Sequence, residues 1–180
     1  TNDSLAYNNL SNTTLYRALV QNAVCPAIYS NHVTIHVLQP VTIANAGNDQ
    51  MLCNVSTATL AANNPSSGTG SWSVLPGAPS AVSFTNPANP STTVNGLSAG
   101  TYFFVWTISN NICADSRDTV QVIVYPPTMA GNLVADATVC ASGNAGIITL
   151  AAYRSAILRW ESSNNNGASW NNIVSTNVSL

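Results

Sequence analysis

An internal repeat with a period near 88 residues is the strongest constraint on how this 180-residue chain folds. The stretch LSAGTYFFVWTISNNIC (residues 97–113) has a degenerate copy in LSNTTLYRALVQNAVC (residues 10–25), and the two copies end in Cys113 and Cys25, which are 88 residues apart. A period of this length indicates tandem domains rather than one large domain.

A second pair of cysteines follows the same period. Cys53 and Cys140 are 87 residues apart, and each precedes a tryptophan at a similar distance: Trp72 by 19 residues and Trp160 by 20. Equivalent tryptophans in two modules indicate core packing rather than a shared ligand site.

The phase of the repeat predicts three regions: residues 1–39, the C-terminal half of an immunoglobulin-like module; residues 40–126, a complete module; and residues 127–180, an N-terminal half. We therefore expect one period of a longer array, cut in mid-domain. Residues 1–39 of an adjacent copy would complete residues 127–180. The copies are either covalently continuous or separate subunits that complement one another by strands or half-domains.

Short apolar-alternating runs between Asn, Gly, Pro and Ser clusters predict an all-β fold of tandem sandwiches. Tyr102 to Ile108 is apolar on both faces, which predicts a mid-sheet strand between layers. The expected strands are residues 14–21, 33–39, 57–63, 70–75, 101–109, 118–125, 146–153 and 156–163.

The composition excludes several classes of function. Charged residues make up 6% of the chain, the net charge is −2, and lysine is absent, so we expect neither nucleic acid nor membrane insertion. No GxSxG elbow, glutamate pair or phosphate loop is present, and we predict no catalysis and no obligatory cofactor. An abundance of Asn, Ser and Thr with four cysteines favours an extracellular, disulfide-bonded protein.

The cysteine positions lead to a specific pairing hypothesis. Cys53–Cys113 lies within the complete module, so we predict this intramodule disulfide. Cys25 and Cys140 fall on opposite sides of that module, too far apart to bridge within one copy, and each is expected to pair in adjacent copies. Four buried free thiols are the alternative.

Several polar residues invite a metal or ligand interpretation. Asp49, Asp115 and Asp118 are candidate calcium ligands, although turn-forming roles are the competing interpretation. His32 and His36 on a strand lie about 13 Å apart, too far to share one ion.

The stretch SNNNGASW (residues 163–170) matches the Asp-box hairpin pattern, which is a structural corner in sialidases. Trp170 has no counterpart in the other module and is a candidate for ligand stacking.

The segments AGNDQMLC, TATLAAN, GSWSV and NPSTTVNGLSAGTYFFVWTISNNICADSRDTVQVIV resemble the PKD-like and Ig-like repeats of giant surface proteins from gliding and other Bacteroidota. RWESSNNNGASWNNI and TTLYRALVQNAVCPAIYSNHVTIHV resemble the Ig-like modules that alternate with such repeats. The resemblance implies type IX secretion, display at the cell surface, and a role as a gliding-motility adhesin or comparable filament. It also implies O-glycosylation of Ser4 and Thr119, each in an Asp-Ser/Thr-apolar tripeptide.

We therefore expect a structural or adhesive repeat that acts as a disulfide-stapled stalk, whose surface or glycan ligand the sequence leaves unknown. A carbohydrate- or protein-binding module, or an accessory region of a secreted enzyme, is the alternative.

Overall fold

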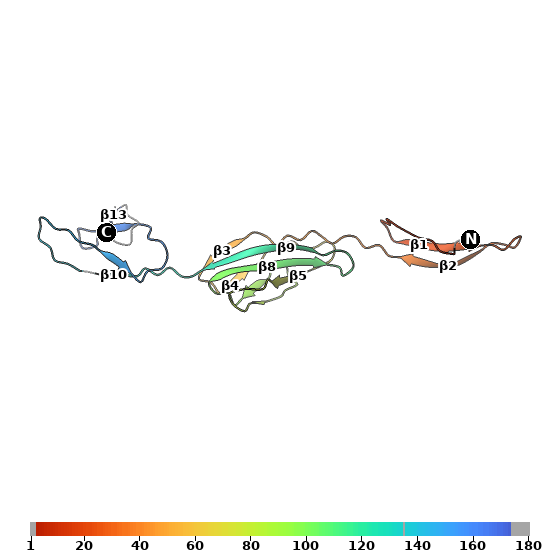
Figure 1. Ribbon diagram of the computed structural model, residues 1–180, viewed down its shortest axis with the longest axis horizontal. Helices are drawn as coiled ribbons and strands as arrows, with labels where there is room; N and C mark the ends of the chain where they lie inside the picture. Colours follow the sequence, from red (N-terminus) through yellow and green to blue (C-terminus); the bar gives the residue numbers. More distant parts are fainter. Residues whose placement is uncertain (1–2, 135, 174–180) are drawn as a thin grey trace. The chain divides into compact units, whose positions relative to one another are not determined.

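The computed structural model describes residues 3–134 and 136–173, and the chain divides into two units between Tyr125 and Pro126. The described residues form β-strands joined by turns and loops, with no α-helix among them (Figure 1). Within this part of the chain no helix is long and apolar enough to cross a membrane. The all-β prediction is confirmed.

The strands of the first unit are β1 (Thr14–Val20), β2 (Ile28–Ile35), β3 (Gln50–Cys53), β4 (Thr57–Thr59), β5 (Thr69–Val74), β6 (Ser83–Phe84), β7 (Thr93–Asn95), β8 (Gly100–Ser109) and β9 (Ser116–Tyr125). The strands of the second unit are β10 (Asn132–Val134), β11 (Thr149–Ala151), β12 (Trp160–Ser162) and β13 (Asn171–Ile173).

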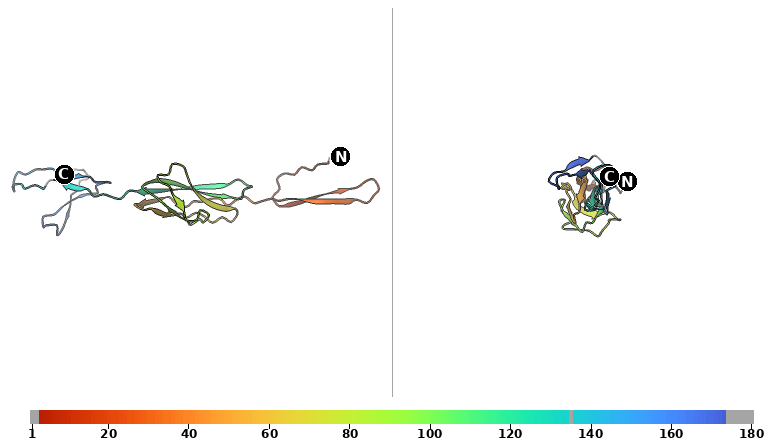
Figure 2. Two further views of the ribbon diagram at one scale, coloured as in Figure 1. Left: turned by 90° about the horizontal axis from the view of Figure 1, so that it is seen from below. Right: turned by 90° about the vertical axis from the view of Figure 1, so that its left-hand side faces the viewer.

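The central module is a two-sheet sandwich (Figures 1 and 2). One sheet has the order β3-β9-β8-β5, in which β3 runs parallel to β9 and the other neighbours are antiparallel. The second sheet has the order β4-β7-β6. Side chains of both sheets share one core; the fully buried larger members are Leu60, Val94, Tyr102, Phe104, Trp106, Ile108, Val120 and Val122.

Strand β8 lies in the middle of the larger sheet, as its sequence predicts. Its alternate residues from Tyr102 to Ile108 are buried in the core. The opposite face is not covered by a second layer along its whole length, because Phe103 keeps 41% of its surface exposed. The expectation of a strand between two layers is therefore correct for one face and wrong at Phe103.

Two tryptophans anchor the contact between β5 and β8. Trp72 pairs directly with Trp106, and the ring centroids lie 5.1 Å apart. The Trp106 ring lies over Gly70, where an added Cβ would overlap the Trp106 side chain. A glycine in this strand therefore makes room for a large ring, which is a known reason for glycine inside strands.

The hairpin β1–β2 forms a two-stranded sheet with a register running from Thr14 opposite Ile35 to Val20 opposite Ile28. We expected the second strand over residues 33–39, and this is wrong: it begins at Ile28 and ends at Ile35. The antiparallel partner decides the bounds, because β1 offers backbone groups opposite Ile28 to Ile35 and none beyond Thr14.

The second unit contains two small antiparallel pairs, β10–β11 and β12–β13. An isolated bridge joins Met129 to Arg154. Among its described residues only Trp160 is a buried hydrophobic residue. This unit therefore has strands without the continuous core that the central module has.

Candidate functional site

The calcium candidates Asp49 and Asp118 accept hydrogen bonds from backbone amides. Asp49 Oδ1 accepts the Gln121 N–H at 2.8 Å, and Asp118 Oδ2 accepts the Ala46 N–H at 2.7 Å. Both bonds tie the first segment of the module to β9. These carboxylates therefore act as tethers between segments that are 72 residues apart in sequence.

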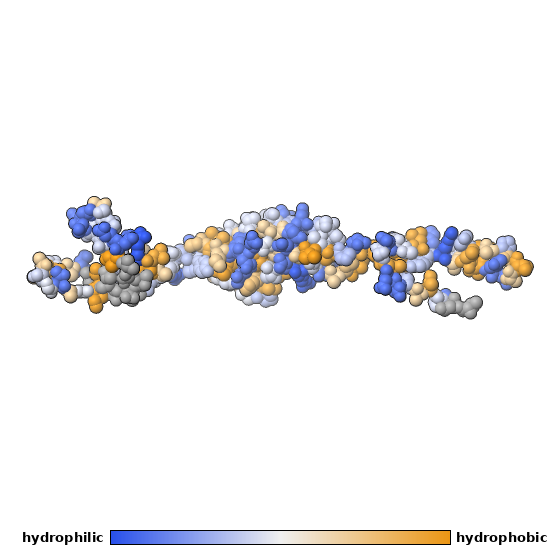
Figure 3. Space-filling view, turned by 90° about the horizontal axis from the view of Figure 1, so that it is seen from above, coloured by the Kyte–Doolittle hydropathy of each residue, from blue (hydrophilic) through white to orange (hydrophobic). Residues whose placement is uncertain are grey.

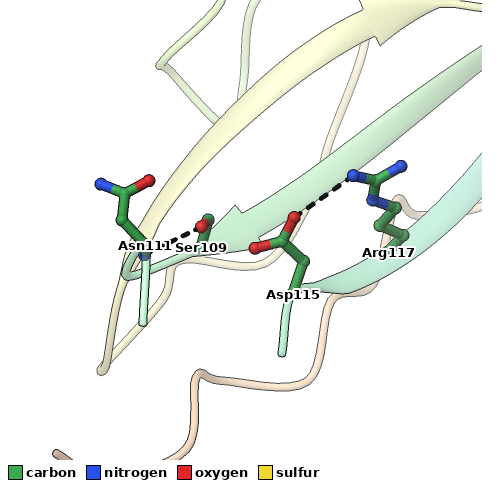
Figure 4. Close-up of polar contacts among 4 residues, drawn as sticks. All are labelled: Ser109, Asn111, Asp115 and Arg117. Atoms are coloured by element: carbon green, nitrogen blue, oxygen red, sulfur yellow. Dashed lines mark hydrogen bonds and ion pairs between the residues drawn. The ribbon is translucent and has the colours of Figure 1, made fainter. Parts of the chain in front are cut away.

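Asp115 lies separately, in the turn between β8 and β9 (Figure 4). The Ser109 hydroxyl and the Arg117 guanidinium, whose Nη2 lies 3.2 Å from Asp115 Oδ2, hold the pKa of this carboxyl below its ordinary value. Ser109 also accepts the Asn111 N–H at 3.1 Å. The turn is thus organised by its own side chains.

The described residues contain no group of three His, Cys, Asp or Glu side chains that could hold a metal ion. His32 lies in β2 opposite Arg17, and His36 follows one residue after the strand ends. In the described part of the chain, neither histidine forms a hydrogen bond or ion pair with Asp49 or Asp118.

Tyr102 forms a polar anchor inside the core that sequence reasoning missed. Its hydroxyl accepts the Ser98 N–H at 2.8 Å, shares a hydrogen bond with Ser80 Oγ at 2.6 Å, and donates to the Ser98 carbonyl oxygen at 3.2 Å. Burial raises the pKa of Tyr102, but the bonds with Ser80 and Ser98 outweigh it and leave the pKa lowered. A tyrosine bonded to backbone four residues upstream is a corner of immunoglobulin-like sandwiches.

The SNNNGASW stretch forms a self-contained turn between β12 and β13. Ser163 Oγ accepts the Gly167 N–H at 2.9 Å, and Asn165 Oδ1 accepts the Ser169 N–H at 2.9 Å. Gly167 has a φ of 79°, which favours glycine. These bonds give the stretch a structural role. Trp170, directly after the turn, remains 59% exposed.

Ser4 and Thr119, the two residues for which glycosylation is expected, are both exposed. Thr119 lies in β9 directly before the first buried residue of that strand, Val120, and points to the opposite face.

All four cysteines are free thiols, so the predicted Cys53–Cys113 disulfide is not formed. Cys53 ends β3 opposite Tyr125, the last residue of β9, whereas Cys113 precedes the first residue of β9. Nine steps of about 3.3 Å along β9 separate these two positions by about 30 Å, far beyond the Cα separation of about 7 Å that a disulfide tolerates. The intramodule pairing is therefore wrong: the parallel crossover places these cysteines at opposite ends of the sandwich.

The most unusual surface belongs to the β1–β2 hairpin, in which apolar side chains are exposed (Figure 3). On one side of the ribbon the exposed members are Val20, Ile28 and Val33, and on the other they are Leu15, Leu19 and Tyr29, each with more than half of its surface accessible. Arg17 covers part of the second side by stacking on the Tyr29 ring at 3.7 Å. We call Val20, Ile28 and Val33, which share one side, the hairpin face.

The second unit has an open, mostly apolar groove of about 460 Å³. Its apolar lining includes Leu133, Leu150, Tyr153, Ile157, Leu158 and Trp160. Leu158 is 87% exposed and Leu133 59%. The segments before and after the central module thus both expose apolar side chains of the kind that a complete sandwich buries. Exposed apolar surface of this kind is typical of an interaction site.

These observations define a class: a β-sandwich module of structural type, flanked by two incompletely packed β segments. A PKD domain family matches residues 46–124, and the central module is a PKD-like domain. A second family model, described as Domain of unknown function (DUF8696), matches residues 1–39 and 129–180. Because these two segments make up half of the sequence, the chain belongs to that family.

Among solved structures, the chain is similar to the PKD domain from the KIAA 1837 protein, with 31% identity, a TM-score of 0.40, and coverage of 47% of this chain and 86% of that one. It is also similar to domains 4 and 5 of the S-layer protein SbsC, with 17% identity, a TM-score of 0.34, and coverage of 63% and 58%. No curated protein matches the chain.

Proposed function

We propose that this chain is a repeat segment of an extracellular stalk or filament, in which residues 1–39 of one copy complete the sandwich begun by residues 127–180 of another. The β1–β2 hairpin carries the proposal. It is an antiparallel hairpin like β8–β9, with a register shift between Arg17 and Leu19 that β8–β9 lacks, and its apolar side chains are exposed. A strand pair with open edges and an apolar face readily adds to another sheet.

The correspondence between the hairpins extends to individual pairs. Tyr16 lies opposite Val33, as Phe104 lies opposite Val120. Each hairpin has its cysteine three residues before the second strand, at Cys25 or Cys113. We therefore assign β1 and β2 the places that β8 and β9 hold in the central module.

The second unit offers a matching position for the hairpin. In the central module, Trp72 of β5 lies against β8. Trp160 follows Cys140 at nearly the distance at which Trp72 follows Cys53, and it begins β12. In the proposed composite module, β12 of one copy therefore lies next to β1 of the following copy. The hairpin face of the following copy then packs into the groove beside Trp160.

The family boundaries support the same assignment. One family model matches both flanks and omits the central module, as expected if the flanks are halves of one kind of domain. The array then alternates PKD-like modules with composite modules of that family.

The proposed role is mechanical. The links between modules are short and contain Pro40 on one side and Pro126 and Pro127 on the other, which favour extended backbone. A net charge of −2 and a surface of amides and hydroxyls make solubility insensitive to salt. At the finer level we propose a type IX secreted Bacteroidota surface adhesin, glycosylated at Ser4 and Thr119, and assign it no catalytic activity.

One observation favours a second candidate, a carbohydrate-binding surface: Trp170 is an exposed tryptophan held at the end of a rigid turn. Titration of a glycan array with the wild-type chain and with Trp170→Ala would test it. Binding that disappears in the variant supports this role, and silence of the wild-type chain excludes it for the glycans on the array.

The stalk proposal is tested by hydrogen exchange on a tandem of two copies joined Leu180 to Thr1. Peptides spanning β1 and β2 are expected to show two exchange populations, because only the hairpin of the second copy has a partner. A single copy is expected to show one fast population. One fast population in the tandem as well contradicts the proposal. Protection of single copies that grows with concentration instead indicates complementation between separate subunits.

A further inference from the structure

The cysteines mark the two ends of the central module. Cys113 lies at the end where the chain enters the module: its Sγ is 3.6 Å from the Gln39 carbonyl oxygen and 3.9 Å from that of Leu38. Asn110 Nδ2, in the same turn, donates to the Gln39 carbonyl oxygen at 3.2 Å. The turn that carries Cys113 therefore rests on the incoming linker.

Cys53 lies at the opposite end, where the chain leaves the module. It pairs in register with Tyr125, and the Asn54 N–H donates to the Tyr125 carbonyl oxygen at 2.9 Å. Cys53 is exposed there. The chain continues directly into Pro126, so this thiol stands beside the outgoing linker.

The two linkers are equivalent. Gln39 and Tyr125 each directly precede a proline, Pro40 or Pro126, at the end of a module's last segment; β2 ends at Ile35, whereas β9 continues to Tyr125. In the central module the first cysteine, Cys53, lies beside the outgoing linker, and the second, Cys113, lies beside the incoming linker. A composite module built in the same way would place its own cysteines at the corresponding linkers, so that each linker would bring together one thiol from each of two successive modules.

We propose that disulfides join successive modules rather than closing them internally: Cys53 with Cys25 of the next copy, and Cys140 with Cys113 of the next copy. The pairing rests on the proposed function, because the hairpin with Cys25 must sit in the composite module. Cys25 then takes the place beside Tyr125 that Cys113 has beside Gln39. Cys140, 12 residues after Thr128 as Cys53 is 11 after Thr42, takes the place of Cys53.

Each bond forms by oxidation of two thiols. A protein disulfide of an extracytoplasmic thiol oxidase exchanges with the first thiolate, and the second thiolate displaces the oxidase thiol. Two protons and two electrons leave the cysteine pair, and the oxidase disulfide becomes a dithiol.

The consequence is mechanical. With these bonds, a covalent path crosses the central module through residues 41–53 alone and continues through Cys25 and β2 of the next copy. Because that path bypasses residues 54–180 of one copy and residues 1–24 of the next, tension is not carried through their strands. Without the bonds, residues 40–126 can unfold to a contour length of about 300 Å.

Two-cysteine tandems test the pairing. Two copies are joined and secreted into an oxidising compartment with all but two cysteines changed to serine. We expect a disulfide, seen as a loss of about 2 Da and protection from alkylation, when Cys53 of the first copy and Cys25 of the second are retained. The same is expected for Cys140 of the first copy and Cys113 of the second.

The matched controls retain Cys53 and Cys113 of one copy, or Cys140 of the first copy and Cys25 of the second, the pairs within single modules. These stay reduced if the proposal is correct. A disulfide in either control pair, or free thiols in both test pairs, overturns the proposed pairing. Hydrogen exchange on the same tandems separates the causes: a protected second hairpin with free thiols refutes the disulfides alone, and an unprotected one refutes the composite module as well.

Discussion

The hairpins β1–β2 and β8–β9 have the same design but opposite environments. Phe104 and Val120, a cross-strand pair in the second hairpin, are 0% and 1% exposed. In the first hairpin, the corresponding Val33 is 57% exposed, and its partner Tyr16 is partly buried by stacking on Tyr7. Register is therefore set locally by the turn and the strands, whereas burial depends on neighbours that a two-stranded ribbon does not supply.

The neighbours of β8–β9 are identifiable. Strands β3 and β5 border this hairpin at both edges, and the sheet β4-β7-β6 covers its inner face. Among the described residues, β1 and β2 pair only with each other. The comparison shows that β1 and β2 have strand-forming sequence and that what they lack, among the described residues, is neighbouring strands to pack against.

The largest contrast is expected from truncating equivalent side chains. Phe104→Ala should lower the free energy of unfolding of the central module by about 3–5 kcal/mol, because it removes a fully buried ring. Tyr16→Ala in the single chain should change it by less than about 0.5 kcal/mol. Urea unfolding followed by tryptophan fluorescence measures both, and an equal effect of the two variants contradicts the comparison.

The contact of Trp106 with β5 gives the next effect. Gly70→Ala places a methyl group inside the Trp106 ring and should destabilise the module by about 1–3 kcal/mol or more. Ser71→Ala, at the neighbouring exposed position, is the control and should be neutral. A Gly70→Ala protein with an unchanged urea midpoint would show that β5 and β8 are not packed as described.

The tyrosine corner should contribute less. Tyr102→Phe removes the hydroxyl and leaves the Ser98 amide without its acceptor, which should cost about 1–2 kcal/mol. Thermal unfolding checks this, with Phe103→Tyr on the half-exposed face as a control that keeps the aromatic content. No change in Tm for Tyr102→Phe would rule out the corner as a stabilising element.

The smallest effect is expected from the turn between β8 and β9. Because the pKa of Asp115 is lowered by Ser109 and Arg117, its contribution is present above the ordinary pKa of 3.8 and is lost as pH falls through the lower folded value. Asp115→Asn should therefore be slightly less stable than wild type near neutral pH and equal to it in strong acid. Unfolding at a series of pH values checks the sign, and a difference that grows in acid contradicts it.

The repeat and the strand alternation predict much of this fold because both can be recognised in the residue pattern without knowing which strands pair. The alternation in residues 101–109 defines β8, and the Cys–Trp spacing identifies Trp72 as a core residue. Short strands such as β6 and β7, of two and three residues, carry too little pattern to be recognised.

The cysteine pairing could not be predicted from spacing, because it depends on topology. Cys53 and Cys113 are 60 residues apart in a single module, which suggests a bridge, but the parallel pairing of β3 with β9 separates them. The Tyr102 corner was also missed, since its partners Ser80 and Ser98 are ordinary loop residues until the fold brings them together.

The assembly of a sandwich from two different copies is tested most directly by a rearranged chain in which residues 127–180 are followed immediately by residues 1–39. Amide exchange and urea unfolding of this chain should show a protected β1–β2 hairpin and one cooperative transition. The two segments expressed separately should show neither. A rearranged chain that exchanges as fast as its separate halves would contradict the account.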